Sequence, residues 1–269
     1  MQNEFEILPT GKKHVSFSEV KLWKECSYRH FLTHVKKIDF SKPSPILSFG
    51  TAVHLACENY LLTKSMDIDI CHKSLEDAWK QNESIEDFNQ KSLTTAKDDS
   101  SKILLEIPNF LNREFPDWEI IDAEHEIYES VQNQTHAFKG FIDGVIKCKG
   151  KRGEDLYWII DWKTSQNGWR KDKRSDEMIK SQLALYKNFW SKKNPQIPLK
   201  NIRCAFVILK KNAKLGQHCE LFSVSLGEVP INRSLKVVNN MITSVKRGIS
   251  IKNRDSCKYC EYYQTNYCV

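Results

Sequence analysis

The sequence predicts an α/β fold in which helices pack around a mixed central β-sheet. Two observations predict this class. Before Trp118, apolar residues recur at helical spacing, whereas from Trp118 onward they alternate with polar residues as in strands. After three successive strand patterns, helical and strand patterns follow one another, which is typical of a sheet covered by helices. We expect one domain over residues 1–269.

The first part of the domain, residues 16–118, is predicted to be mainly helical. Ser16 begins a capping-box pattern, so a helix is expected to begin here and to carry Cys26. A second helix, which follows a pair of prolines, carries His54 on a partly apolar face. A charged helical insertion is expected over residues 69–113.

The sheet belongs to residues 119–228, and residues 229–269 supply a last helix and a cysteine-rich tail. Polar, turn-forming residues separate the first three strand patterns from one another. The strands are predicted at 118–130, 137–150, 156–165, 201–210 and 219–226, with helices at 175–192 and 232–247.

The composition is that of a folded, water-soluble protein. The chain has 269 residues and a net charge of +7, with 40% hydrophobic and 28% charged residues. No stretch approaches the roughly 20 apolar residues of a membrane span, and the first residues lack the apolar run of a secretory signal. We therefore expect a cytoplasmic protein with no membrane partner.

The positive charge is concentrated in the last third of the chain. Residues 191–269 contain fourteen Lys and Arg against four acidic residues, a net charge of +10, so the preceding part carries −3. Residues 191–214 hold seven basic residues and no acidic one. This stretch suits contact with a phosphate backbone, although a solvated lysine-rich face is an equally good interpretation.

Eight of the nine cysteines fall into two groups, and the ninth is Cys26 of the predicted N-terminal helix. A disulfide framework is not expected in a reduced compartment, so metal ligation or catalysis must be considered. Three cysteines crowd the last thirteen residues, where they have no evident packing role. Five others are predicted to be small buried hydrophobic residues: Cys57, Cys71, Cys148, Cys204 and Cys219.

Two aspartates interrupt apolar strand patterns. Asp143 and Asp161 would be costly to bury unless they served a metal or a partner. Lys163 shares a strand face with Asp161, and the backbone carbonyl of Trp162 lies between them. If the Asp143 strand is the hairpin neighbour, the two carboxylates offer the oxygen ligands that Mg²⁺ prefers. The alternative is an ordinary ion pair at an edge strand.

Six motifs follow one another along the chain: the helix with Cys26, G-x-x-x-H ending at His54, G-x-x-D ending at Asp143, D-x-K from Asp161 to Lys163, Q-x-x-x-Y from Gln182 to Tyr186, and the cysteine-rich tail. Their order resembles the RecB-like branch of the PD-(D/E)XK nucleases over nearly the whole chain. Within that branch the chain is most similar to exonucleases that carry an iron-sulfur cluster, such as the CRISPR-associated RecB-like exonucleases and the AddB nuclease domain.

The resemblance implies a nuclease core over residues 119–228 and a role for each motif residue. Lys163 would orient or activate the attacking water. A further carboxylate could come from Glu124 or Glu126, and the sequence does not decide between them. The implied ligands of Mg²⁺ or Mn²⁺ are His54, Asp143, Asp161 and the carbonyl of Trp162, while Gln182 and Tyr186 would contact DNA near the scissile phosphate.

The resemblance also implies a role for four cysteines. Cys26 would join Cys257, Cys260 and Cys268 as ligands of one [4Fe-4S] cluster that clamps the N-terminal helix to the C-terminus. Zn²⁺ is the alternative, because four thiolates suit it equally well.

The implied function is a metal-dependent DNA exonuclease that acts on single-stranded DNA or duplex ends. Trp162 and Trp169 could stack on unpaired bases. The candidate settings are DNA repair, recombination, phage DNA processing and CRISPR adaptation. In recombination or CRISPR adaptation, the chain would also have protein partners. The alternatives are a non-catalytic DNA-binding scaffold with the same fold and cluster, and a nucleic-acid binder stapled by zinc.

Overall fold

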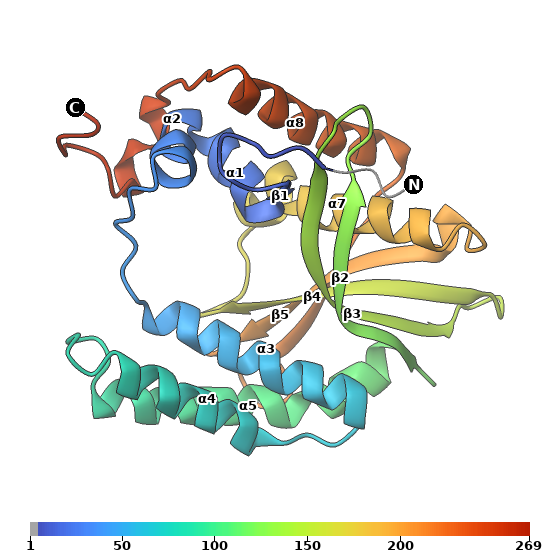
Figure 1. Ribbon diagram of the computed structural model, residues 1–269. Helices are drawn as coiled ribbons and strands as arrows, with labels where there is room; N and C mark the ends of the chain where they lie inside the picture. Colours follow the sequence, from blue (N-terminus) through green and yellow to red (C-terminus); the bar gives the residue numbers. More distant parts are fainter. Residues whose placement is uncertain (1–4) are drawn as a thin grey trace.

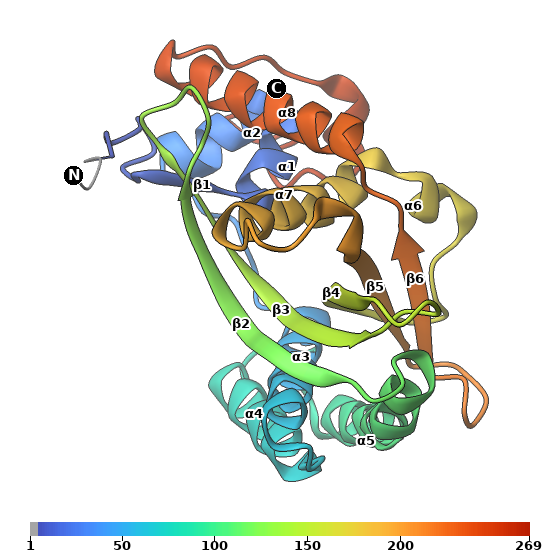
Figure 2. The same ribbon diagram turned by 90° about the vertical axis from the view of Figure 1, so that its right-hand side faces the viewer.

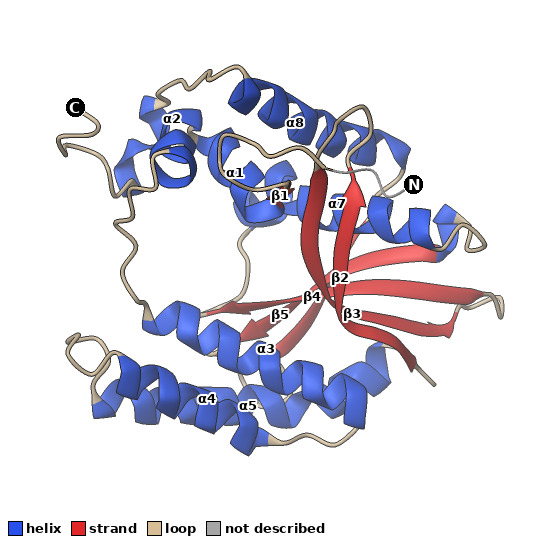
Figure 3. Ribbon diagram, viewed as in Figure 1, coloured by secondary structure: helices blue, strands red, loops and turns tan. Residues whose placement is uncertain are grey.

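The computed structural model describes residues 5–269, apart from the side chain of Tyr259. It is an α/β structure with one mixed six-stranded sheet flanked by helices (Figures 1 and 3), which confirms the predicted class. The strands are β1 His14–Ser16, β2 Glu119–Ser130, β3 Ala137–Lys149, β4 Asp155–Ser165, β5 Ile202–Lys210 and β6 Cys219–Val224.

The sheet is built around β3, which has three neighbours. β2 pairs with β3 along most of its length, so β1 and β4 must share the other edge of β3. β4 pairs with residues 144–149 of β3, and β1 pairs with residues 137–139. The segment 140–143 between these two ladders therefore has no strand beside it on that edge, within the described chain. β5 runs parallel to β4, and β6 is antiparallel to β5.

Helices cover both faces of the sheet (Figures 1 and 2). One face packs against α3, α4 and α5, whose apolar residues share a core with Trp162. The other face packs against α7 and α8, with Phe138 and Phe206 in their core. The helices are α1 Phe17–Glu25, α2 Ser27–His30, the π-helix η1 Phe31–Val35, α3 Pro45–Thr63, α4 Ile68–Gln81, α5 Gln90–Glu114, α6 Lys171–Ser175, α7 Glu177–Lys193, the 3₁₀ helix η2 Leu199–Asn201, α8 Glu228–Lys246 and the 3₁₀ helix η3 Arg254–Tyr259.

The predicted N-terminal helix is interrupted. Ser16 caps α1 by accepting a hydrogen bond from the backbone N–H of Glu19, as expected, but the helix ends at Glu25. Cys26 is extended (φ −159°, ψ 108°) and its Sγ atom caps the next short helix by accepting from Arg29 N–H at 3.5 Å. The expectation of one continuous helix through Cys26 is therefore wrong, because this residue bends the chain toward the C-terminal tail.

The remaining elements lie close to their predicted positions. The insertion between α3 and β2 is helical, and the strands and long helices that follow agree with the pattern to within a few residues. None of the helices within residues 5–269 has the length and hydropathy needed to span a membrane.

Candidate active site

The two aspartates lie where β3 and β4 separate. The ladder between these strands ends at the pair Gly144 and Ile160, so Asp143 and Asp161 are the first residues beyond it. Beyond the ladder, the backbone N–H of Trp162 donates a hydrogen bond to Oδ2 of the Asp143 carboxylate at 2.7 Å. Both carboxylates are buried, Asp161 with an exposed fraction of 1% and Asp143 with 9%. The expected convergence of the two strands is present.

Asp143 carries a strongly perturbed carboxyl group. Burial, followed by the neighbouring charge of Asp161, raises its pKa well above the ordinary value. Loss of hydration disfavours the charged carboxylate, and repulsion between the two buried carboxylates adds to this effect. A bound cation would remove this repulsion, so the donor chemistry of the pair fits a hard divalent ion.

His54 reaches the same place from the middle of α3. Its Nδ1 atom lies 3.5 Å from Oδ2 of Asp143, and the backbone of Trp162 is close enough to affect its pKa. Burial lowers the pKa of His54, although the charge of Asp161 opposes the shift. The imidazole is therefore neutral near pH 7, the form that can ligate a metal.

Lys163 is held by Asp161. Its Nζ atom is 2.5 Å from Oδ2 of Asp161. Burial lowers the pKa of Lys163, but the charges of Asp161 and Asp143 outweigh it and raise the pKa. Lys163 therefore stays a cation beside the two carboxylates. It provides a fixed positive charge and hydrogen-bond donors, not a free amine that could accept a proton.

Gln182 and Tyr186 meet the site from α7. The Nε2 atom of Gln182 donates to Oδ1 of Asp161 at 2.7 Å and lies 3.2 Å from the hydroxyl of Tyr186. Burial raises the pKa of Tyr186, and the charge of Asp161 adds to the shift. Gly140 leaves room for this ring, because a Cβ atom there would lie 2.9 Å from Cε1 of Tyr186. The G-x-x-D motif thus has glycine at position 140 because a larger residue would clash with Tyr186.

Of the two candidate glutamates, Glu124 lies near the site. It stands opposite Asp143 between the paired residues of β2 and β3, with φ 49°, a left-handed conformation rare in a strand. Burial raises its pKa, and the charges of Glu58 and Asp161 add to the shift. Glu126 instead forms an ion pair with Lys139 at 2.9 Å.

Glu58 is a neighbour that the sequence analysis missed. It follows His54 by four residues on α3, so the two side chains share a helix face. The four-residue spacing from His54 is the sequence signal that could have pointed to Glu58. Its charge helps to raise the pKa of Glu124, so a further carboxylate lies near the edge of the site.

The site residues come from four elements but do not form a closed metal cage. Among residues 5–269, no group of three or more His, Cys, Asp or Glu side chains is arranged as a metal site. The donor atoms that approach one another are those of His54, Asp143, Asp161 and the Trp162 backbone, in the contacts given above.

The expectation that Trp162 and Trp169 stack on bases is wrong. Their exposed fractions are 1% and 5%, because Trp162 packs in the core beneath α3 and Trp169 packs against Phe206 and Phe222. A base has no access to either ring.

The four cysteines predicted to act together lie in the wall of one small cavity: Cys26, Cys257, Cys260 and Cys268. All nine cysteines are free thiols, and the five predicted packing cysteines are buried. Cys26 anchors the junction, because its Sγ atom accepts from Asn253 N–H at 3.4 Å and contacts the carbonyl of Ile251 at 3.8 Å. Two segments more than two hundred residues apart are thus joined.

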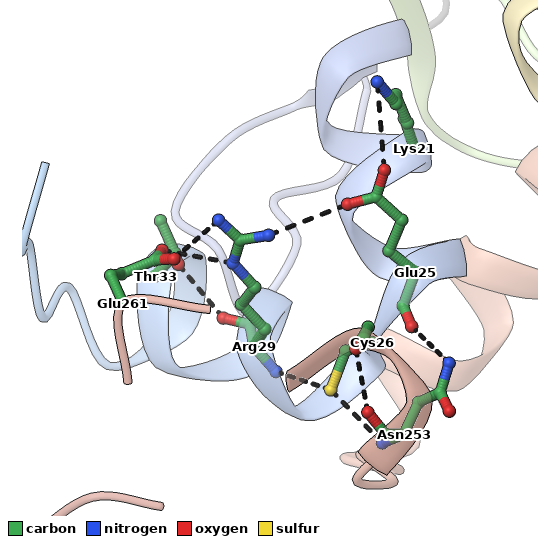
Figure 4. A network of polar contacts seen from close by, with 8 residues as sticks. Lys21, Glu25, Cys26, Arg29, Thr33, Asn253 and Glu261 are labelled. Atoms are coloured by element: carbon green, nitrogen blue, oxygen red, sulfur yellow. Dashed lines mark hydrogen bonds and ion pairs between the residues drawn. The ribbon is translucent and has the colours of Figure 1, made fainter. Parts of the chain in front are cut away.

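Charged and polar contacts hold the tail in place (Figure 4). Arg29 makes two contacts with Glu261, from Nε to Oε1 at 3.1 Å and from Nη2 to Oε2 at 2.5 Å. Asn253 donates from Nδ2 to the carbonyl of Glu25 at 2.8 Å. On the other side, the hydroxyl of Tyr262 donates to the carbonyl of Ile38 at 2.5 Å. Contacts between the N-terminal helices and the tail therefore hold the walls of the cysteine cavity together.

Comparison with known proteins agrees with this architecture. The model of the PD-(D/E)XK nuclease superfamily matches residues 14–265. No curated protein sequence matches the chain.

The solved structures that are similar to the chain include the following two. One is a protein from Eubacterium rectale named "Putative exonuclease", with 16% identity and a TM-score of 0.57, over 94% of this chain and 89% of that one. The other is SSO0001, with 14% identity and a TM-score of 0.36, over 91% of this chain and 93% of that one. At these identities, the first likeness concerns the fold alone.

Proposed function

The chain belongs to the PD-(D/E)XK nuclease superfamily, and from this premise we propose that it is a Mg²⁺- or Mn²⁺-dependent DNA exonuclease acting on single-stranded DNA or duplex ends. One observation carries the proposal. Asp143, Asp161 and Lys163 converge with His54 at the point where β3 and β4 separate.

The ligands of the metal would be His54, Asp143, Asp161 and the carbonyl of Trp162. When bound, the ion would lower the pKa of water and neutralise charge on the phosphodiester. The neutral form of His54 and the mutual repulsion of the two carboxylates support this assignment.

The protein's own residues would orient the reaction. Lys163, fixed by Asp161, would hold the attacking water by a hydrogen bond and stabilise the negative charge that develops on the phosphate. Gln182 holds Asp161 from the other side and would position the phosphate with the Tyr186 hydroxyl. Neither Lys163 nor Tyr186 would act as the base, because both have raised pKa values.

For the four cysteines we propose one [4Fe-4S] cluster, with Zn²⁺ as the alternative. Their common cavity and soft thiolate donors support either group. The group would tie the N-terminal helices to the tail and needs no redox role. We further propose a cytoplasmic setting in repair, recombination, phage DNA processing or CRISPR adaptation, with DNA as the partner.

The function is tested by comparing linear and covalently closed circular single-stranded DNA with the purified protein. We expect Mg²⁺ or Mn²⁺ to support release of nucleotides from labelled ends of the linear strand, and EDTA to stop it. The closed circle should remain intact. Binding of both DNAs without cleavage would instead support the non-catalytic scaffold, and cleavage of the circle would indicate an endonuclease.

A further inference from the structure

A large cavity lies away from the candidate active site, at the opposite end of β4. Its volume is about 610 Å³, within the range of small-molecule pockets. It opens beside the last residues of β6 and the start of α8, two elements that follow one another directly (Figure 2). The lining residues that matter below are Trp158, Lys187, Lys200, Arg203, Leu226, Gly227 and Glu228.

The predicted basic stretch, residues 191–214, contributes to this cavity. It does not form a single surface, because β5 divides it. Arg203 stands near the first end of β5 and Lys210 at the last. Lys200 and Arg203 line the cavity, whereas Lys210 pairs with Glu220 at 3.4 Å.

A buried lysine adds a third positive charge. Lys187 projects from α7 with an exposed fraction of 6%, and its Nζ atom donates to the carbonyl of Leu226 at 2.7 Å. An ammonium group has three donors, and this bond uses one. Burial lowers the pKa of Lys187; the nearby Arg203 charge also lowers it, while Cys204 opposes. A buried cation with another positive charge nearby is stabilised by an anion.

The N-terminus of α8 faces the same space. Gly227 caps this 19-residue helix without a side-chain hydrogen bond in the described chain, and a Cβ atom there would meet nothing within 4 Å. The first N–H groups of a helix and its dipole attract anions. Glu228 is the only acid among the described lining residues, against three cations.

We propose that this cavity binds a nucleoside monophosphate. The phosphate would lie near Lys187, Arg203 and the backbone N–H groups of Glu228 and Val229, since Pro230 has no N–H to offer. The space exceeds what a phosphate ion alone needs, and its wall is largely apolar, with Trp158 and leucine side chains suited to a base. The site is separate from Asp161, and its existence does not depend on the proposed nuclease activity.

Calorimetric titration of the full-length protein with dAMP in EDTA tests the proposal. We expect saturable binding of one dAMP, at least tenfold tighter than binding of adenosine or inorganic phosphate. Arg203→Gln and Lys187→Met should each weaken it about tenfold or more, the typical effect of losing a charge-assisted hydrogen bond. The matched control is Lys214→Gln, an exposed lysine outside the cavity, which should bind as the wild type.

A folding check and one further variant, Asp161→Asn, keep the result decisive. Arg203 is exposed, so Arg203→Gln should fold normally even if Lys187→Met does not; circular dichroism checks both. Asp161→Asn should retain dAMP binding. The proposal is overturned if dAMP does not bind, if Arg203→Gln binds dAMP as the wild type does, if Asp161→Asn loses dAMP binding, or if adenosine, phosphate or a short oligonucleotide binds as tightly as dAMP.

Discussion

The backbone N–H of Trp162 donates to the Asp143 carboxylate at 2.7 Å, where the ladder between β3 and β4 has ended. A peptide group that would otherwise pair with a strand thus fixes a carboxylate beside Asp161. The carbonyl of Trp162, in the next peptide unit, lies on the His54 side of the site. The separation of two strands is therefore what assembles the candidate active site.

Asp143 should lower the stability of the metal-free protein. Its pKa is raised, so the folded state holds the proton more tightly than the unfolded chain does. Stability is then lost as the pH rises above the ordinary value of about 4 toward the folded pKa. Asp143→Asn should melt at a higher temperature than the wild type in EDTA at pH 7, with a smaller difference near pH 4.

Thermal melting with and without Mn²⁺ measures the electrostatic cost of Asp143 and its contribution to metal binding. Mn²⁺ should raise the melting temperature of the wild type and leave that of Asp143→Asn unchanged, since binding to the folded state stabilises it. Asp172→Asn changes an exposed carboxylate and serves as the control. If Asp143→Asn melts at a lower temperature than the wild type in EDTA at pH 7, the expected electrostatic cost of Asp143 is contradicted.

Gly140 and Gly50 should respond differently to alanine. At Gly140 a Cβ atom would lie 2.9 Å from Tyr186 and 3.2 Å from Phe138, so Gly140→Ala should destabilise by about 1–3 kcal/mol. At Gly50, inside α3, the nearest atom is Thr164 Oγ1 at 3.6 Å, an ordinary contact. Gly50→Ala should be neutral or stabilise by up to about 1 kcal/mol. Denaturant unfolding gives both values, and equal losses would refute the steric explanation.

The helices and strands could be predicted largely from the sequence, because hydrophobic period and capping are local signals. β1 could not, since three residues pairing with β3 leave no periodic pattern. The break at Cys26 depends on contacts with Ile251 and Asn253, which lie at the other end of the chain. Local periodicity carries no information about such contacts.

The candidate site was predictable in its motif residues and not in its surroundings. Choosing Glu124 over Glu126 requires the irregular backbone of β2 at Glu124, which alternation alone does not reveal. The burial of Trp162 and Trp169 depends on which face each ring takes and on what packs there. Sequence patterns place residues on elements, whereas packing decides which atoms remain accessible.

Tyr262 should contribute to stability through its hydroxyl. The side chain is 1% exposed, and the hydroxyl bonds to the carbonyl of Ile38 and to Thr33. Tyr262→Phe removes both hydrogen bonds, although Thr33 keeps its bond to the carbonyl of Arg29, and should cost about 1–3 kcal/mol in denaturant unfolding. Tyr263→Phe, at an exposed neighbour, should be close to neutral. Equal stability of the two variants would mean that this contact does not hold the tail.

The cysteine proposal predicts a coloured protein after anaerobic purification. Cys26→Ser and Cys257→Ser should each lose the visible absorbance and the bound iron, because a thiolate ligand is removed. Cys219→Ser should keep both, since Cys219 lies in the α3–α5 core, away from the cysteine cavity. A colourless wild type with stoichiometric zinc would establish the alternative, and a metal-free wild type would contradict both.

The central claim is that Asp161 and Lys163 lie at the catalytic centre, and the most direct measurement is the rate of Mg²⁺-dependent release of nucleotides from end-labelled linear DNA. Asp161→Asn and Lys163→Ala should reduce the rate at least about a hundredfold while DNA binding persists. Lys151→Ala, at an exposed hairpin lysine, should retain the wild-type rate. Wild-type rates in Asp161→Asn or Lys163→Ala would contradict the account.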